Sequence, residues 1–336
     1  MSGFEMGMAL ADVLSATILF AVPLLLVAMG GMFSERSGVI NIALEGIMIV
    51  GALFGCLMLR WLDPAVTAGT LNSFIAMLVA ILFAAVTGAA FSMLLAFASI
   101  NLKADQTIGG TALNMLAPAF AIVLTWVIQG QGQTTILIPT WSRITAASLG
   151  ITPNSSSILQ KFLFSNLYMT TILTVILFAV AVILLYKTKF GLRLRACGEH
   201  PQAADSVGIN VYRMRYSGVF ISGILGGIGG LAFTLAAGSG FQSSVAGYGF
   251  LALAVMIFGN WKPWSILGAA LFFSFFKVIG AYASSLPFIP TVKLEGVSTY
   301  FWPMLPYLIT MVLLILTSKK SRAPKAEGIP YDKGSR

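Results

Sequence analysis

Long apolar runs separated by short polar segments dominate the pattern of this chain. Nine such runs occur, at residues 13–33, 38–59, 73–99, 112–128, 167–186, 217–238, 244–260, 264–285 and 300–318. Most are close to the roughly 20 residues that an α-helix needs to cross a bilayer core, although 244–260 is short for this purpose. The runs lack the alternation of polar and apolar residues that a membrane β-barrel requires. Because backbone groups in lipid must be hydrogen-bonded internally, the pattern predicts an all-α integral membrane protein, a polytopic helix bundle.

The composition agrees with this prediction. Hydrophobic residues make up 58% of the 336 residues and charged residues only 9%, with a mean hydropathy of +0.92. Soluble domains carry roughly 25% charged residues. These values exclude a soluble enzyme, a disordered chain and a nucleic-acid-binding domain, so the expected partner is the lipid bilayer and not nucleic acid. Cys56 and Cys197 are too few for a disulfide framework.

The distribution of Lys and Arg predicts the orientation of the bundle. If the N-terminus lies outside, fifteen of the twenty basic residues fall in segments on the cytoplasmic side and four fall outside. The excess of positive charge on that side favours an external N-terminus and a cytoplasmic C-terminus. The first twelve residues contain Glu5 and Asp12 but no Lys or Arg, which argues against a cleavable signal peptide. Five of the six tryptophans, Trp261 among them, fall at predicted span ends, where the interface favours amphipathic rings.

Outside the apolar runs, no segment is long enough to form a soluble domain. Residues 1–318 are therefore expected to form one transmembrane domain, whose longest cytoplasmic loop spans 187–216. Residues 319–336 form a basic cytoplasmic tail that contains two prolines and is predicted to be disordered.

Motifs for ATP hydrolysis and for metal binding are missing from the sequence. The dipeptide Gly-Lys does not occur, so there is no phosphate-binding G-x-x-x-x-G-K-[ST] loop. His200 is the single histidine, which excludes an H-E-x-x-H metal site. We therefore expect a chain that is not an enzyme and that itself binds no metal and no cofactor.

Several polar residues interrupt the predicted spans. Glu45 lies about eight residues, or roughly 12 Å, inside the second run, and Asn41 precedes it by four residues, on the same face of a helix. An ionised carboxylate at mid-membrane costs on the order of 2.5–3.5 kcal/mol, so Glu45 is expected to face the bundle interior. Glu45 and Asn114 are either interhelical hydrogen-bond contacts or part of the lining of a transport path. Lys277 lies in another run, and no spacing rule decides whether it pairs with Glu45.

Glycines are concentrated in the 217–238 run. Gly223 and Gly227, and likewise Gly226 and Gly230, form G-x-x-x-G pairs, which allow helix backbones to approach closely. The pattern favours tight helix packing over a gating hinge.

The loop at 187–216 contains a short helical pattern. Pro201 is well placed in the first turn of the segment PQAADSV, and Gly208 is placed to end it. The small side chains of Ala203 and Ala204 provide a surface that another protein can approach closely. The alternative is a basic loop that only fixes the topology.

Four stretches of this sequence resemble a known family. They are FSERSGVINIALEGIM at 33–48, ADQTIGGTALNMLAPAF at 104–120, 191–233 and 247–272. They are similar to permease subunits of ABC importers, in the branch with ribose and branched-chain amino-acid permeases and closest to the nucleoside, or simple-sugar, subgroup. The resemblance runs from about residue 13 to 318. Ribose-type permeases have ten spans, so the expected bundle has about nine to ten transmembrane helices in a bacterial plasma membrane.

The resemblance implies a role for the loop. In the family, an E-A-A…G segment forms a coupling helix that docks on a partner ATPase. The matching positions here are Gln202, Ala203, Ala204, Gly208 and Ile209, with Glu199 and Asp205 beside them. The leading acidic residue of the family is replaced by Gln202, which changes the side chain offered to the ATPase. ATP and Mg²⁺ would then bind the partner ATP-binding subunit.

Further partners follow from the same resemblance. A second, related permease subunit is expected, as a heterodimer, and an extracytoplasmic lipoprotein is expected to deliver the substrate. The implied function is a membrane permease subunit that forms half of the translocation pathway for nucleosides or related ribosyl and sugar compounds.

Five residues are candidates for the lining of the expected pathway, and two other functions are alternatives. The candidate path residues are Asn41, Glu45, Asn114, Tyr248 and Phe250, of which the two aromatic rings are expected to stack on a base or sugar. One alternative is an ion-gradient-driven secondary transporter of a small polar solute. It would need intramembrane carboxylates to carry the ion, and Glu45 is the single candidate. A membrane scaffold without a pathway is a second alternative, disfavoured by the number of polar groups in the spans.

Overall fold

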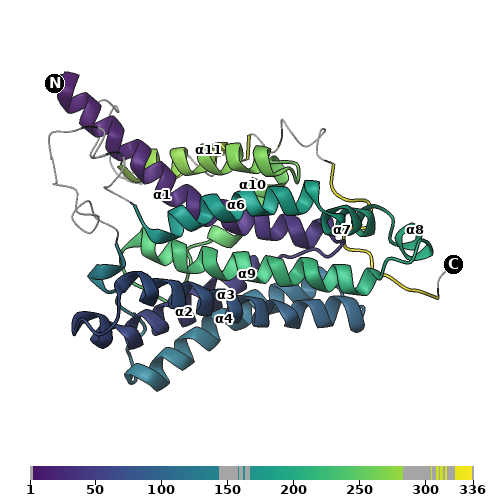
Figure 1. The fold of residues 1–336 in the computed structure, drawn as a ribbon, viewed down its shortest axis with the longest axis horizontal. Coiled ribbons are helices and arrows are strands. Elements are labelled where there is room, and N and C mark those ends of the chain that lie inside the picture. The colour runs from purple at the N-terminus through teal and green to yellow at the C-terminus, as the bar shows by residue number, and fades with distance from the viewer. Residues whose placement is uncertain are drawn as a thin grey trace.

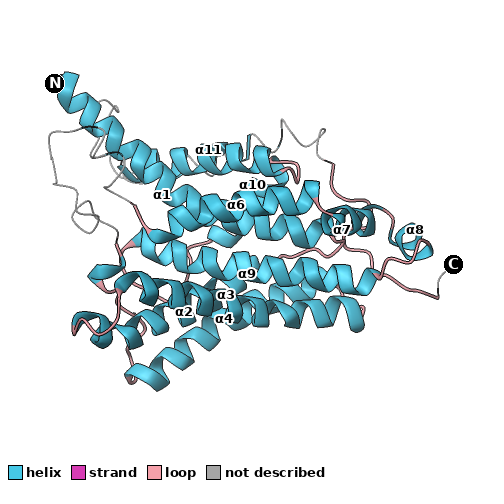
Figure 2. Cartoon of the chain, viewed as in Figure 1, coloured by secondary structure: helices cyan, strands magenta, loops and turns pink. Residues whose placement is uncertain are grey.

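A computed structural model describes residues 3–143, 167–282 and 322–334, with eight isolated positions between 158 and 315. Helices connected by loops make up these residues, without a strand among them (Figure 2). The elements are α1 (Gly3–Arg36), α2 (Leu44–Thr67), α3 (Ser73–Ala96), the π-helical turn η1 (Phe97–Asn101), α4 (Gln106–Gln129), the 3₁₀ turn η2 (Thr140–Ser142), α6 (Met169–Lys187), α7 (Lys189–Glu199), α8 (Pro201–Ser206), α9 (Val211–Ala237), α10 (Tyr248–Phe258) and α11 (Pro263–Tyr282).

Seven helices in the described part of the chain are long and apolar enough to cross a membrane. They are α1, α2, α3 with η1, α4, α6, α9 and α11, so seven of the nine predicted runs are confirmed as long helices. The prediction of a span at 244–260 is wrong, because α10 has 11 residues and reaches only about 16 Å. The run at 300–318 lies outside the described segments, and the predicted total of nine to ten is not confirmed.

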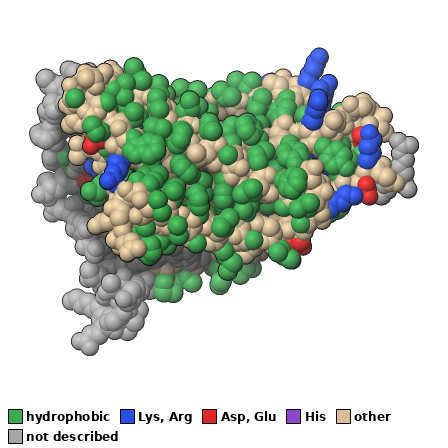
Figure 3. All heavy atoms as spheres, turned by 90° about the horizontal axis from the view of Figure 1, so that it is seen from below, with side chains coloured by type: hydrophobic (Ala, Val, Ile, Leu, Met, Phe, Trp, Pro, Cys, Tyr) green, Lys and Arg blue, Asp and Glu red, His purple; other side chains and the backbone are tan. Residues whose placement is uncertain are grey.

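The long helices lie side by side along the long axis of the molecule (Figure 1). α1, α2 and α9 are mostly buried, whereas α4 and α6 expose most of their apolar side chains. On the face shown in Figure 3, hydrophobic side chains cover the middle, and Lys and Arg gather toward the two ends. We call the end that carries α7, α8 and residues 322–334 the basic end. The arrangement is that of a bundle whose outer helices face lipid or another subunit.

The glycines of α9 bring three helices into close contact. A Cβ added at Gly227 would collide with the backbone of Ala84 in α3, and one at Gly230 would collide with Met48 in α2. Gly51 of α2 also lies against Gly227. These contacts confirm tight packing as the role of the glycine pattern.

A leucine at position 227 is expected to prevent this packing. Its side chain has no space without moving α3, and overpacking a core costs about 1–3 kcal/mol or more. The matched control is Gly268→Leu, because a Cβ at Gly268 of α11 meets nothing within 4 Å. Size-exclusion chromatography and thermal unfolding in mild detergent should show loss of folded protein for Gly227→Leu and near-normal behaviour for Gly268→Leu. Equal melting temperatures for the two variants would contradict the packing role.

The second predicted span begins later than expected. Residues 37–43 are not helical, and α2 begins at Leu44. Gly38 adopts a φ of +98°, which ends the preceding helix, and the Ser34 hydroxyl donates a hydrogen bond to the carbonyl of Val39. The prediction that Asn41 and Glu45 share one helical face is therefore wrong, because Asn41 precedes the helix that contains Glu45.

Candidate functional site

A segment rich in turns separates α9 from α10. Residues 238–247 have left-handed φ angles at three glycines and also at Ser243 (57°) and Ala246 (51°). Residues other than glycine rarely adopt a positive φ. A right-handed α-helix requires negative φ angles, so the chain is not helical again until α10 begins at Tyr248. Asn260 and Trp261 adopt φ angles of 52° after the other end of α10. α10 is thus a short helix between two strained turns, a feature that often marks functional segments.

Glu45 caps the N-terminus of α10. Its Oε1 accepts a hydrogen bond from the backbone N–H of Gly247 at 2.9 Å, and its Oε2 accepts one from Gly249 at 2.7 Å. The side chain is buried, with 8% of the residue exposed. The first turn of a helix has unpaired N–H groups and a partial positive charge, so a carboxylate stabilises it. Glu45 therefore connects α2 with α10, the interhelical alternative left open by the sequence.

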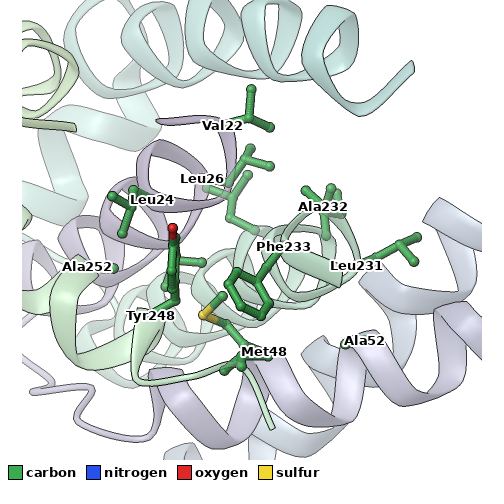
Figure 4. Close-up of a cluster of buried hydrophobic side chains, with 14 of the residues drawn as sticks. Val22, Leu24, Leu26, Met48, Ala52, Leu231, Ala232, Phe233, Tyr248 and Ala252 are labelled. Atoms are coloured by element: carbon green, nitrogen blue, oxygen red, sulfur yellow. The ribbon is translucent and has the colours of Figure 1, made fainter. Parts of the chain in front are cut away.

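Lys277 and Tyr248 meet at the same turn. The Lys277 Nζ atom lies 3.8 Å from the centre of the Tyr248 ring, a cation–π contact. The ring centroids of Tyr248 and Phe233 are 4.4 Å apart, and both rings lie between the ribbons of α1, α2 and α9 (Figure 4). The ion pairs found in the described segments do not include one between Lys277 and Glu45. Glu45 and Lys277 therefore both contact the first turn of α10.

Asn41 and Asn114 hold the non-helical segment that precedes α2. Asn41 is fully buried and donates from Nδ2 to the Ser222 hydroxyl in α9 at 2.8 Å. Asn114 donates to the Ile42 carbonyl and accepts from the Gly46 N–H, both at 2.8 Å. Both amide atoms of Asn114 are paired with protein groups, whereas Asn41 is paired through Nδ2 and its buried Oδ1 has no hydrogen-bond partner among the described residues. The contacts of Asn114 favour a positioning role over direct substrate contact.

Phe250 differs from the other predicted path residues. It lies on α10 two residues after Tyr248 and is 51% exposed, whereas Tyr248 is 1% exposed. The structure therefore brings Glu45 and Tyr248 together, and it places Asn114 beside Glu45 through Gly46. Phe250 is the candidate whose side chain remains accessible.

The predicted coupling segment is a separate feature at the basic end (Figure 1). α8 has Pro201 in its first turn, and Gly208 follows it with a φ of +82°, so the predicted short helix is confirmed. The seven predicted coupling residues fall into three classes of exposure. Gln202, Ala203 and Gly208 are exposed, Glu199, Asp205 and Ile209 are half-buried, and Ala204 is buried. One side of α8 is thus accessible, and the opposite side packs against the rest of the chain.

The end of α1 connects this segment with the turn between α10 and α11. Arg36 donates to the Trp261 carbonyl at 3.0 Å and pairs with Glu199 at 3.8 Å. The Trp261 indole donates to Glu35 Oε2 at 2.6 Å. Trp261 is 3% exposed, so its predicted role as an interface anchor is wrong. No spacing rule links positions 36, 199 and 261, which is why sequence reasoning missed this contact.

Glu327 of the tail also reaches the end of α1. Its carboxyl group forms a side-chain hydrogen bond with Glu35, and burial raises the pKa of Glu327 although that hydrogen bond and the charge of Arg36 act in the opposite direction. Two carboxyl groups in contact must share a proton. The contact therefore needs one proton between the two carboxyl groups while the tail is in place.

Tail docking is consequently expected to weaken as the pH rises. A carboxyl group with a raised pKa stabilises the docked state below its ordinary pKa and loses this contribution as the pH rises through the raised value. Hydrogen exchange, corrected for the intrinsic pH dependence of exchange, measures the protection of the Ala326 amide, which donates to Gly198. Protection should fall with rising pH in the wild type and remain constant in Glu327→Gln. The same pH dependence in both proteins would contradict this role of Glu327.

Comparisons with known proteins extend over nearly the whole chain. The family described as "Branched-chain amino acid transport system / permease component" matches residues 13–318. The chain is 41% identical over 328 residues to the guanosine ABC transporter permease protein NupQ of Bacillus subtilis, covering 97% of this chain and 98% of that protein. It is 38% identical over 319 residues to the nucleoside ABC transporter permease protein NupC of Lactococcus lactis, covering 94% and 95%. NupB, a second nucleoside ABC transporter permease protein of that organism, is 25% identical over 321 residues, covering 94% and 84%. No solved structure matches the chain.

Proposed function

The chain belongs to the family of permease components of branched-chain amino acid transport systems, and from this premise we propose that it is the membrane permease subunit of an ATP-driven importer for nucleosides. It forms half of the translocation pathway, and related ribosyl or sugar compounds are further candidate substrates. The observation that carries the proposal is the likeness to permeases named for guanosine and nucleosides over almost the full length of both chains.

The missing phosphate-binding loop and the exposed side of α8 support the partners proposed for this subunit. It lacks a phosphate-binding loop, so ATP and Mg²⁺ bind a separate ATP-binding subunit that docks on the exposed side of α8, at Gln202 and Ala203. A second, different permease completes the pathway, since Lactococcus lactis has two permeases named for nucleosides that match this chain to different degrees. An extracytoplasmic lipoprotein delivers the substrate.

The sidedness proposed here places the basic end in the cytoplasm of a bacterial cell. α7 and the tail carry most of the basic residues outside the spans, and such residues favour the cytoplasmic side. The N-terminus of α1 then faces outward.

Coupling within the subunit is proposed to run from α8 to α10. Motion of the ATPase reaches Glu199 and Arg36, which holds the Trp261 carbonyl at the end of α10. At the start of α10, Glu45 holds the backbone of Gly247 and Gly249. A shift of α10 between its two strained turns then moves Phe250, the accessible aromatic ring that we expect to contact the nucleobase. The alternative of an ion-driven transporter gains no support, because both oxygens of Glu45 are occupied by backbone amides.

Gentle purification of the tagged chain from its native membrane tests the proposed assembly. We expect an ATP-binding subunit and a second related permease to be identified with it by mass spectrometry. Recovery of this chain alone, in a preparation that retains transport, would contradict the proposal.

A further inference from the structure

The C-terminal tail is bound across the basic end, contrary to the expectation of disorder. Residues 322–334 run over the molecule beside α7 and α8 and end at the outer side of the basic end (Figure 1). Successive contacts tie this tail to four parts of the chain. The Arg322 N–H donates to Asn260 Oδ1 and the Ala326 N–H to the Gly198 carbonyl, the Ile329 carbonyl accepts from Arg215, and Asp332 pairs with Lys103.

Tyr331 is the anchor of this tail. It is 4% exposed and packs in a cluster with Cys197 of α7, Ala204 of α8 and Val211 of α9. Its ring centroid lies 5.4 Å from that of Tyr212, in an edge-to-face arrangement. This cluster is separate from the main hydrophobic core of the bundle. Tyr331 therefore forms part of the surface on which the buried side of α8 rests.

Arg215 of α9 holds the tail by a hydrogen bond to its backbone. Its side chain is 1% exposed, and its NH1 group donates to the Ile329 carbonyl at 2.9 Å. The Nε and NH2 atoms of Arg215 have no hydrogen-bond partner among the described residues. A buried cation is costly unless it is paired or hydrogen-bonded. The tail carbonyl is thus an acceptor that this guanidinium requires.

The tail and α8 depend on each other for burial. α8 is a single short helix of 6 residues, too short to be stable without tertiary contacts. Its buried residue Ala204 packs in the same cluster as Tyr331. We propose that residues 322–332 form a strap that holds α8 in the position needed for coupling, with Tyr331 as the anchor and Arg215 as the residue that fixes the strap to α9.

This inference rests on the proposed function in one respect, the role of α8 as the surface that meets the ATPase. Tyr331 acts through α8 and is a positioning residue. The test therefore needs one measurement of the strap itself and a second measurement of coupling. The first must not depend on transport.

Cys197 reports the strap independently of transport. It is fully buried beside Tyr331, and burial raises the pKa of its thiol to about 11, so it should react slowly with maleimide. In a Cys56→Ala background Cys197 is the single thiol. For the full chain in mild detergent, we expect labelling to be at least tenfold faster in Tyr331→Ala and in a truncation after Arg322. Controls are Ile329→Ala, whose side chain is 56% exposed, and a truncation after Asp332.

Coupling is then measured on the same variants in the reconstituted complex. We expect Tyr331→Ala to lower nucleoside uptake per ATP hydrolysed at least fivefold while the controls keep the wild-type ratio. Slow Cys197 labelling in both strap variants would overturn the strap. Fast labelling with an unchanged ratio would overturn its positioning role. A wild-type complex without ATP-driven uptake would refute the proposed function, and with it the coupling role, whereas the labelling result would still decide whether the strap exists.

Discussion

Glu45→Ala is expected to lower nucleoside uptake strongly and to destabilise the protein. The substitution leaves the backbone N–H groups of Gly247 and Gly249 without their acceptors inside the membrane. Each unpaired buried donor costs about 1–3 kcal/mol, so the first turn of α10 should unwind or shift. We expect uptake to fall by about tenfold or more, and the melting temperature of the purified protein to fall with it. Glu45→Gln keeps one acceptor oxygen and should be intermediate.

The matched control is another carboxylate that caps a helix. Asp105 accepts hydrogen bonds from the N–H groups of Thr107 and Ile108 at the start of α4, at 2.8 and 3.0 Å, but it is exposed. Water can replace its oxygens, so Asp105→Ala should cost only about 0.5–2 kcal/mol and leave uptake near the wild-type level. If both alanine variants transport equally well, Glu45 does not have the role described for it.

Gly208→Val is expected to separate ATP hydrolysis from uptake. Gly208 has a φ of +82°, and a Cβ there would meet nothing within 4 Å, so the effect of valine is confined to the backbone. A side chain in this conformation costs about 1–2 kcal/mol, which should distort the end of α8. We expect uptake to fall at least tenfold while the complex still hydrolyses ATP and the subunit remains folded in the membrane.

Gly69 provides the control for this strain. It has a φ of +74° and equally open surroundings, but it follows α2 at the end opposite α8. Gly69→Val introduces the same backbone strain away from the ATPase, so its ratio of uptake to ATP hydrolysis should match the wild type. Normal coupled uptake in Gly208→Val, or equal loss in both variants, would contradict a specific role for α8.

The long helices could be predicted from the sequence because their signal is local. Continuous apolar runs such as 73–99 and 167–186 require burial or lipid along their whole length, and each becomes one helix. α8 could be predicted for the same reason, because proline favours the first turn of a helix and glycine favours its end, and both preferences are local. The close-packed glycines of α9 were also predictable, since G-x-x-x-G is a repeat within a single helix.

The break before α10 and the contacts of Glu45 could not be predicted in this way. Residues 244–260 are apolar except for Ser244 and Asn260 at their two ends, and their break depends on backbone angles at Ser243 and Ala246 that single-residue preferences do not indicate. The partners of Glu45 lie about 200 positions away. The tail was misjudged because its basic composition is typical of disorder, whereas Tyr331 and the carbonyl of Ile329 find partners on α9 only in the folded chain.

Uptake of radiolabelled guanosine by cells that depend on this chain for nucleoside uptake tests whether ATP drives the transport. ATP is depleted in one sample, and the ion gradients are collapsed with ionophores at constant ATP in the other. We expect uptake to stop when ATP is depleted and to continue when the gradients collapse. Uptake that survives ATP depletion and fails without the gradients would show that the chain is an ion-driven transporter and not a subunit of an ATP-driven importer.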